Sequence, residues 1–175
     1  MAANTDAPFG FRYIQNLTGG DERLRTFIHA AADGVAIGRG DLVTVTGAAD
    51  TVEQYDNNDP IHALALNYVA LSVLGDVSCV FLNHTSVMEC QEDSDGGSIA
   101  AASEALNAGV IVGAANTTTG LSIMEIDSSS AATTATLGLR LLQPSPRVGN
   151  TAATSNAIWL VSPLELNIAE GKAGV

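Results

Sequence analysis

Basic side chains are scarce in this sequence. Seven lysines and arginines stand against nineteen aspartates and glutamates, which gives a formal net charge of −12 over 175 residues. Proteins that bind nucleic acids neutralise phosphates with clustered Lys and Arg, and the sequence contains no such cluster. We therefore expect no nucleic-acid partner, although an acidic balance also serves solubility alone.

Long apolar runs and leader signals are also missing. No window approaches the roughly 20 consecutive apolar residues of a membrane-spanning helix. Residues 1–6 have neither the basic region nor the apolar core of a secretion signal. We therefore expect no membrane partner and a chain that folds in a cytoplasm.

Charge of either sign is sparse, whereas apolar residues are not. Charged residues make up 15% of the chain, against roughly 25% in an average soluble protein. Hydrophobic residues make up 46%, enough for one domain with a real core. A subunit that stays in an assembly needs less charge for solubility than a free monomer does. The composition therefore favours an assembled protein, although extracellular β-proteins share this trait.

Only two cysteines are present, Cys79 and Cys90. In a cytoplasmic protein such a pair is typical of free thiols. A hairpin that closes at residues 83–86 would place Cys79 opposite Cys90, within disulfide range. A slip of one residue would destroy this pairing. We favour two buried thiols and keep the disulfide as the alternative.

Short apolar and β-branched runs between turn residues predict an all-β fold, a compact barrel or sandwich of short antiparallel strands. Residues 50–60 are polar and predict a surface loop. One short helix is expected at 98–107, because Ser98 can cap it and Gly109 can end it. Strands are expected at 24–29, 42–47, within 61–74, and at 77–82, 110–113, 121–126, 137–143, 157–162 and 164–168.

The first 21 residues predict an extended N-terminal arm, followed by a β-domain at 22–169 and a flexible tail at 170–175. Phe9, Phe11 and Tyr13 alternate with Gly10 and Arg12, so the three aromatic rings point to one side of an extended chain. This side must be buried either on the protein's own domain or on a neighbouring subunit. The sequence leaves both possibilities open.

The most acidic stretch is the best candidate for a metal site. It holds Glu89, Glu92, Asp93 and Asp95, and Asp93-x-Asp95-Gly96 resembles part of a calcium-binding loop. The remaining ligands of such a loop are missing, so a solvated turn is favoured. Asp56, Asn58 and Asp59 are interpreted in the same way, because Asn/Asp-rich turns are common without any ion.

Signals for catalysis are missing. His29, His62 and His84 are far apart and lack ligand spacing, and no Gly-x-Ser-x-Gly motif places a serine with a base. The single tryptophan, Trp159, lies in an apolar run that is typical of a core strand. We therefore expect no enzyme activity, no catalytic residues, no cofactor and no required metal.

Several short motifs together resemble a family of tailed-bacteriophage head proteins, the decoration or cement proteins. They cover most of the chain, and their order and spacing carry the resemblance more than any one motif does. These elements are Ala7–Arg12, Gly40–Val43, Gln91–Asp93, Gly120-x-Ser122 with Asp127–Ser129, and Ile158–Val161. The family often carries Asn-x-x-Gly near the end of its penultimate turn, whereas this chain has Val148-Gly149-Asn150.

The resemblance implies a virion structural protein on the outer surface of a capsid, assembled in the host cytoplasm. Its partner would be the major capsid protein, which it would bridge and stabilise as a homotrimer. Phe9, Phe11, Arg12 and Tyr13 would be the partner-binding residues of the arm. The alternatives are a phage tail or fibre component, a carbohydrate-binding β-module and, last, a hydrolase.

Overall fold

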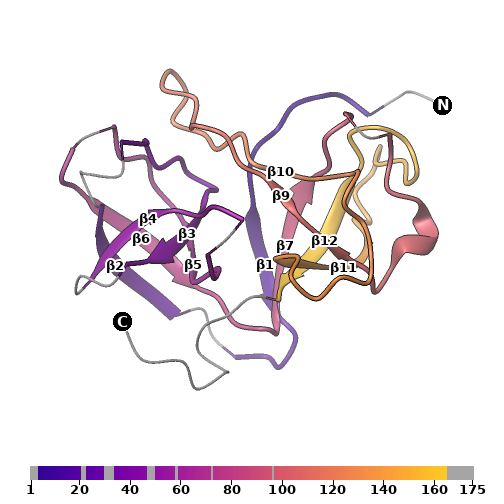
Figure 1. Cartoon of the computed structure of the whole chain (residues 1–175), viewed down its shortest axis with the longest axis horizontal. Coiled ribbons are helices and arrows are strands. Elements are labelled where there is room, and N and C mark those ends of the chain that lie inside the picture. The colour runs from indigo at the N-terminus through magenta and orange to yellow at the C-terminus, as the bar shows by residue number, and fades with distance from the viewer. Residues whose placement is uncertain are drawn as a thin grey trace.

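The structure is a computed structural model of the chain, in which residues 4–20, 23–29, 34–46, 50–57, 59–71, 73–95 and 97–164 are described. Nearly all of its regular structure is β, which confirms the expected all-β class. The strands form two lobes that lie side by side (Figure 1). We call them the barrel lobe and the sheet lobe.

The barrel lobe is a small closed barrel with the strand order β2-β4-β3-β5-β6. Its strands pair antiparallel except β2 with β4, which run parallel. Side chains at alternate positions fill its interior, among them Phe27, Val77 and Cys79. Its strands are β2 (Arg23–His29), β3 (Leu42–Val45), β4 (Thr51–Gln54), β5 (Ala63–Ala65) and β6 (Asp76–Phe81).

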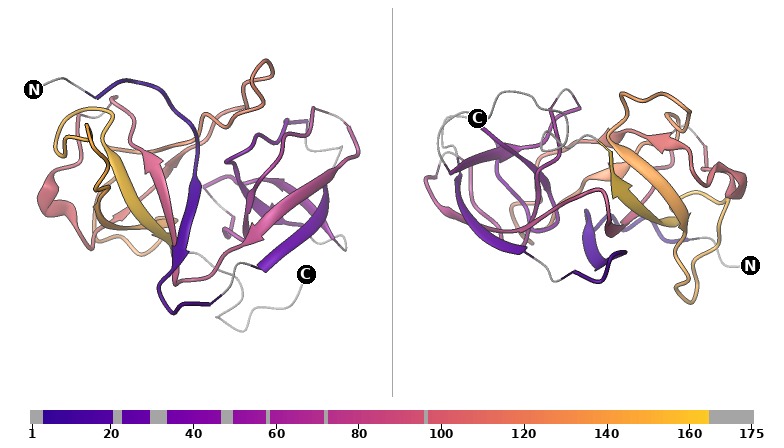
Figure 2. Two further views of the ribbon diagram at one scale, coloured as in Figure 1. Left: turned by 180° about the vertical axis from the view of Figure 1, so that it is seen from behind. Right: turned by 90° about the horizontal axis from the view of Figure 1, so that it is seen from below.

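The sheet lobe is an antiparallel five-stranded sheet in the order β1-β7-β12-β11-β8, and a two-stranded pair, β9 with β10, lies beside it (Figure 2). The strand β1 is an edge of the sheet and lies on its barrel side (Figure 1). The strands are β1 (Arg12–Asn16), β7 (Ser86–Gln91), β8 (Asn107–Ala108), β9 (Val110–Ile111), β10 (Glu125–Ile126), β11 (Leu139–Pro144) and β12 (Ile158–Pro163).

The larger hydrophobic core joins the two lobes. The cross-strand row Leu42, Leu64 and Val80 lies on the outer face of the barrel, and all three side chains are buried. They belong to the same apolar cluster as Met88 and Trp159 of the sheet lobe. Because each buried side chain of this kind contributes about 1.5–3 kcal/mol, the shared cluster holds the lobes together.

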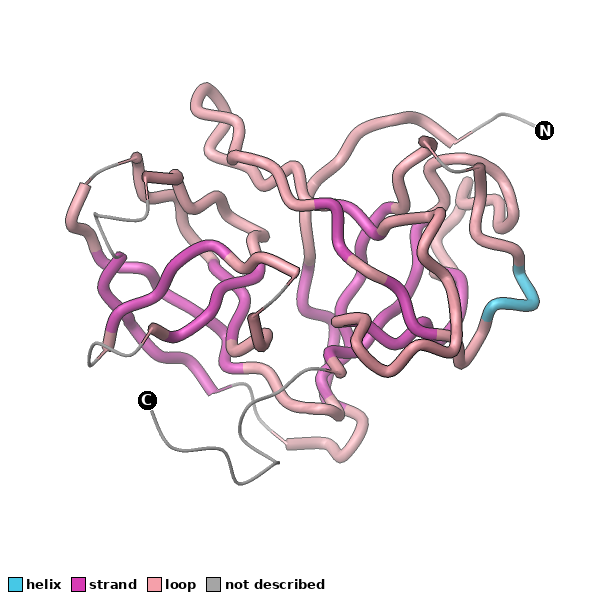
Figure 3. The backbone as a smooth tube through the Cα atoms, viewed as in Figure 1, coloured by secondary structure: helices cyan, strands magenta, loops and turns pink. Residues whose placement is uncertain are grey.

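The expected helix at 98–107 is wrong in extent. Only a 3-10 turn, η1 (Ala101–Ser103), forms there, and it is the one helical element among the described residues (Figure 3). Ala105 then takes a positive φ of 67°. Asn107 begins the strand β8, where it pairs with Arg140 of β11. The segment is too short to form a stable helix alone, and pairing with the sheet overrides its helix propensity.

The hairpin at residues 83–86, on which the disulfide alternative depended, does not form, because β6 and β7 belong to different sheets. The turn exists, with Ser86 N donating to Asn83 O at 2.9 Å, but it leads from the barrel lobe to the sheet lobe. Cys79, in β6, is therefore paired with Arg25 of β2 and Ala65 of β5. Cys90, in β7, is paired with Trp159 of β12. Both cysteines are free and buried, which confirms the favoured thiols and removes the disulfide alternative.

Most of the other strands lie within the ranges expected from the sequence or extend one residue beyond them. Two others form where no strand was expected, β1 in the predicted arm and β4 in the predicted loop at 50–60. The polar residues of β4 are tolerated because the strand is short and only Val52 points into the barrel. The predicted tail at 170–175 and most of the predicted edge strand at 164–168 lie outside the described residues.

Candidate binding groove between the two lobes

The N-terminal segment, residues 4–16, is fastened along the sheet lobe. The side chain of Asn4 donates to Thr151 O at 3.0 Å and to Thr154 Oγ1 at 2.9 Å. Gln91 Nε2 donates to the backbone oxygen of Thr5 at 2.9 Å. From Arg12 onward the segment is β1, which pairs with β7. The segment is thus extended as expected, and it is an integral part of the sheet.

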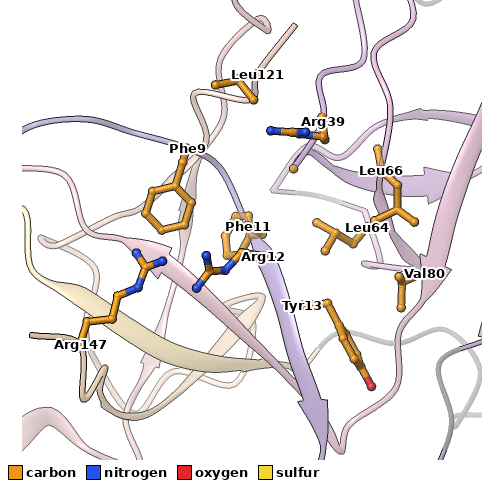
Figure 4. A pocket seen from close by; sticks show the side chains of 12 residues that line it. Phe9, Phe11, Arg12, Tyr13, Arg39, Leu64, Leu66, Val80, Leu121 and Arg147 are labelled. Carbon is orange, nitrogen blue, oxygen red and sulfur yellow. The ribbon is translucent and has the colours of Figure 1, made fainter. Parts of the chain in front are cut away.

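The three aromatic side chains of this segment line one groove between the lobes (Figure 4). Phe11 is 2% exposed and belongs to the shared core, and Tyr13 packs against that core. Phe9 is half-buried. The structure therefore gives part of the answer that the sequence left open, because Phe11 is buried on its own domain while Phe9 and Tyr13 stay partly accessible.

A buried carboxylate ties β1 to the rest of the sheet lobe. Glu89 on β7, 2% exposed, accepts a charged hydrogen bond from Arg12 Nη2 at 2.6 Å and forms an ion pair with Arg147 Nε at 3.2 Å. Ser145 Oγ donates to the same carboxylate at 2.5 Å. The guanidinium of Arg147 also lies 5.7 Å from the ring centre of Phe9. This network satisfies a charge that would be costly to bury alone, and it fixes Arg12 and Phe9 at the groove.

The turn at residues 38–41 is the junction at which the two lobes and the N-terminal segment meet. Gly40 O accepts from Phe11 N at 2.8 Å, and Gly40 N donates to Ala65 O at 2.8 Å. Arg39 forms a backbone bridge with Leu121, in the loop between β9 and β10. Three segments that are remote in sequence therefore converge on four residues.

Asp41 is the buried polar centre of this junction. Its Oδ2 accepts from Gly38 N at 2.7 Å and from Gln54 Nε2 at 2.9 Å. Burial raises the pKa of Asp41, and hydrogen bonds from Ser122, Gly38 and Gln54 oppose that rise. An Asp at this position holds the turn in shape, so its role is structural.

Glycine is required at the junction because the backbones approach too closely for a side chain. A Cβ on Gly10, where φ is +70°, would lie 2.2 Å from the Cβ of Ser122 and 2.7 Å from Gly40 O. A Cβ on Gly38 would lie 2.7 Å from the Cβ of Ala115. All three distances are shorter than van der Waals contact allows, so neither position has room for a side chain.

The groove itself has a volume of about 640 Å³ and combines an apolar floor with a basic rim. Leu64 and Val80 of the barrel form its floor, and Leu66 and Leu121 flank it (Figure 4). Three of the seven basic residues of the chain, Arg12, Arg39 and Arg147, line it as well. The lining is completed by Phe9, Phe11, Tyr13, Gly40 and Ala65.

The acidic residues that suggested a metal site are not arranged as one. Glu89 is held by two arginines, and Asp93 Oδ1 accepts from Ser128 N at 2.9 Å. Glu92 Oε2 accepts from Ile99 N at 2.9 Å and from Trp159 Nε1 at 3.2 Å. No group of three or more His, Cys, Asp or Glu side chains suited to a metal occurs in the part of the chain that is described. Asn58, of the second candidate loop, lies outside that part.

Two of the histidines serve the barrel lobe. His29 Nδ1 lies 3.0 Å from Val73 O, and His62 Nδ1 accepts from Val45 N at 3.1 Å. Burial lowers the pKa of His62, which keeps its ring neutral at neutral pH. Both rings therefore act as packed polar members of the barrel lobe.

Within the described ranges no helix has the length and apolar character to cross a membrane.

Comparison with known proteins gives no match to a family model, to a curated protein or to a solved structure. The function must therefore be argued from the groove itself. Sequence reasoning found four of its residues, Phe9, Phe11, Arg12 and Tyr13, and missed Arg39 and Arg147. The scarcity of basic residues could have pointed to Arg39 and Arg147, because a chain with only seven basic residues offers few candidates for binding an anionic group.

Proposed function

We propose that this chain is a virion structural protein that decorates a mature phage capsid from outside and stabilises it by bridging major capsid protein subunits. The observation that carries the proposal is the inter-lobe groove. An apolar floor, a basic rim and an edge strand together suit contact with a polypeptide, and its lining holds no pairing of a nucleophile with a base.

The motifs behind the resemblance to decoration proteins add support. Gly10, Gly40-Asp41 and Ser122 are remote in sequence, yet they meet at the junction that forms one end of the groove. This part of the motif set converges on one place, as a shared binding surface would require. The convergence also has a packing cause, so it supports the proposal together with the groove and not alone.

The proposed mechanism is additive burial. Each copy would place the groove and its partly accessible aromatic side chains, Phe9 and Tyr13, against neighbouring capsid subunits, and a homotrimer would present three such surfaces at once. Linked weak contacts give an avidity much greater than that of one contact. The net charge of −12 agrees with an outer position, because packaged DNA would repel an acidic inner layer.

Binding to shells tests this proposal directly. The purified protein would be mixed with expanded, emptied capsids and with immature capsids of the phage that encodes it, and co-sedimentation would be measured. We expect saturable binding to the expanded shells only, together with a higher melting temperature of the decorated shells. Absence of binding to either shell would overturn the proposal, and strong hits on a glycan array would favour the carbohydrate-binding alternative.

A further inference from the structure

We propose that the groove accepts an extended acidic segment of the partner protein, and that Arg39 is the receptor for a carboxylate of that segment. The inference rests on the proposed function in one respect, because it takes the groove as the attachment surface. It adds the chemistry of the partner segment and the residue that selects it.

The charges around the groove favour an acidic occupant. Arg12 and Arg147 share the buried carboxylate of Glu89, which leaves two positive charges against one negative charge. Arg39 is exposed and forms no ion pair with any residue that the structure describes. The rim is thus net positive on a chain whose formal charge is −12. A carboxylate is attracted to this rim, whereas a basic segment is repelled.

Arg39 is held in place by its backbone. Its N–H donates to Gly120 O at 2.9 Å, and its carbonyl oxygen accepts from Ser122 N at 3.0 Å. The neighbouring Gly40 is bonded to both Ala65 and Phe11. In Figure 4 the guanidinium points away from the barrel and toward the side of the groove that carries Phe9. A ligand that binds Arg39 therefore has to order only its side chain and not its backbone.

The apolar surface beside Arg39 indicates what flanks the carboxylate. Leu66 is 39% exposed at the rim and the partly accessible ring of Tyr13 lines the opposite wall, whereas Leu64 and Val80 at the floor are already buried. A free inorganic anion would leave this surface wet. A peptide with apolar residues next to its Asp or Glu would cover it, and burial there would strengthen the charged hydrogen bond to Arg39.

Selection from a library of displayed random peptides tests the inference without any capsid. The probe is the library itself, panned on the intact protein, on Arg39→Glu and on Arg23→Glu. Arg23 is a matched control because it is exposed, lacks an ion pair with the described residues and does not line the groove. We expect the intact protein and Arg23→Glu to enrich peptides with Asp or Glu next to apolar residues. Arg39→Glu should lose that enrichment.

Affinity measurements on one enriched peptide complete the test. Arg39→Gln should weaken binding on the order of tenfold, as expected for one lost charge-assisted hydrogen bond, and Arg23→Gln should not weaken it. Replacing the acidic residue of the peptide with its amide should weaken binding to the same degree. Enrichment without acidic residues, or equal affinity of Arg39→Gln and the intact protein, would overturn the inference.

The two proposals can fail separately. If the intact protein and Arg39→Gln bind expanded capsids equally well, decoration stands and the role of Arg39 is wrong. If the library selects acidic peptides through Arg39 but no capsid is bound, the groove chemistry stands and the capsid partner is wrong.

Discussion

Three carboxyl groups, those of Asp41, Glu92 and Glu125, have one oxygen each that is buried without a hydrogen-bond partner among the described residues. Burial raises the pKa of all three, for Glu92 and Glu125 to about 7. At Glu125 the nearby charges of Asp6, Asp93 and Asp95 raise the pKa further. The folded state therefore favours the protonated form of each of these groups more than the unfolded state does.

The consequence for Glu92 is a defined pH dependence of stability. Its folded pKa of about 7 lies above its ordinary value of 4.5, so the folded state binds the proton more tightly than the unfolded state does. Its contribution to the free energy of unfolding is therefore full below pH 4.5 and is lost as the pH rises toward 7. Glu92→Gln keeps an acceptor for Ile99 N and Trp159 Nε1 but removes this titration.

Urea unfolding at several pH values measures the effect. We expect the free energy of unfolding of Glu92→Gln to fall less between pH 4.5 and 7 than that of the unchanged protein. Glu104→Gln, at an exposed position, is the control and should follow the unchanged protein. Parallel curves for Glu92→Gln and the unchanged protein would show that folding does not raise the pKa of Glu92.

Two glycines with nearly the same backbone conformation allow the cost of a left-handed backbone to be measured separately from the cost of a steric clash. Gly10 has φ of +70° and no room for a Cβ, whereas Gly19 has φ of +71° and nothing within 4 Å of the Cβ position. Gly19→Ala should cost roughly 1–2 kcal/mol for the left-handed backbone alone. Gly10→Ala should cost roughly 1–3 kcal/mol more, because Ser122 and Gly40 must move. Equal losses in urea unfolding would contradict the close packing of the junction.

The sequence predicted side-chain positions best where a local pattern determines them. The alternation of Phe9, Phe11 and Tyr13 predicted a shared side, and all three line the same groove. It could not pair Glu89 with Arg12 and Arg147, which are 77 and 58 positions away along the chain. Ion pairs at such separations depend on the fold, and no local pattern announces them.

At the scale of elements, the N-terminal segment is both an edge strand and a wall of the groove. Local patterns found its extended form, but not its pairing, because β1 reaches β7 across some 70 intervening residues. The same difficulty explains why the sequence left the hairpin at residues 83–86 open as an alternative. The sequence around residues 83–86 is typical of a turn, yet the partners of β6 and β7 are chosen by two different sheets.

The aromatic residues of this segment should have separable roles. Phe11→Ala removes a ring that is 2% exposed, so it should cost about 3–5 kcal/mol in the free energy of unfolding. Phe9→Ala removes a half-buried ring that packs on Arg147, so it should cost less than half as much. If the groove is the attachment surface, as proposed, Phe9→Ala should nevertheless weaken attachment to capsids.

Urea unfolding and capsid co-sedimentation would be measured on both variants. Tyr13→Ala, at the other partly accessible ring, is a second test of attachment. If Phe9→Ala unfolds as easily as Phe11→Ala, both rings belong to the core. If Phe9→Ala and Tyr13→Ala each bind capsids at full strength, the groove is not the attachment surface.

At the scale of the whole molecule, the shared core should make the two lobes unfold together. The cluster that contains Leu64 and Val80 of the barrel also contains Cys90 and Trp159 of the sheet lobe. Opening either lobe alone would expose part of this cluster to water. The barrel has a separate inner cluster, which includes Cys79, so each lobe carries one thiol in its interior.

The two thiols therefore report on the two lobes separately. Burial raises the pKa of Cys79 to about 12 and that of Cys90 well above its ordinary value, so neither should react with a thiol reagent at pH 8 while the protein is folded. Cys90→Ala and Cys79→Ala each leave a single thiol. Both single-thiol proteins should become reactive over the urea range in which their own Trp159 fluorescence changes.

A different order of events would reveal independent lobes. If Cys79 reacted at a urea concentration that left the Trp159 signal native, the barrel would open first and the inter-lobe core would contribute little to its stability. The groove would then be a contact between two movable bodies, and its shape would depend on which lobe is open. A common transition instead means that the groove keeps its walls until the whole chain unfolds, as the proposed attachment surface would require.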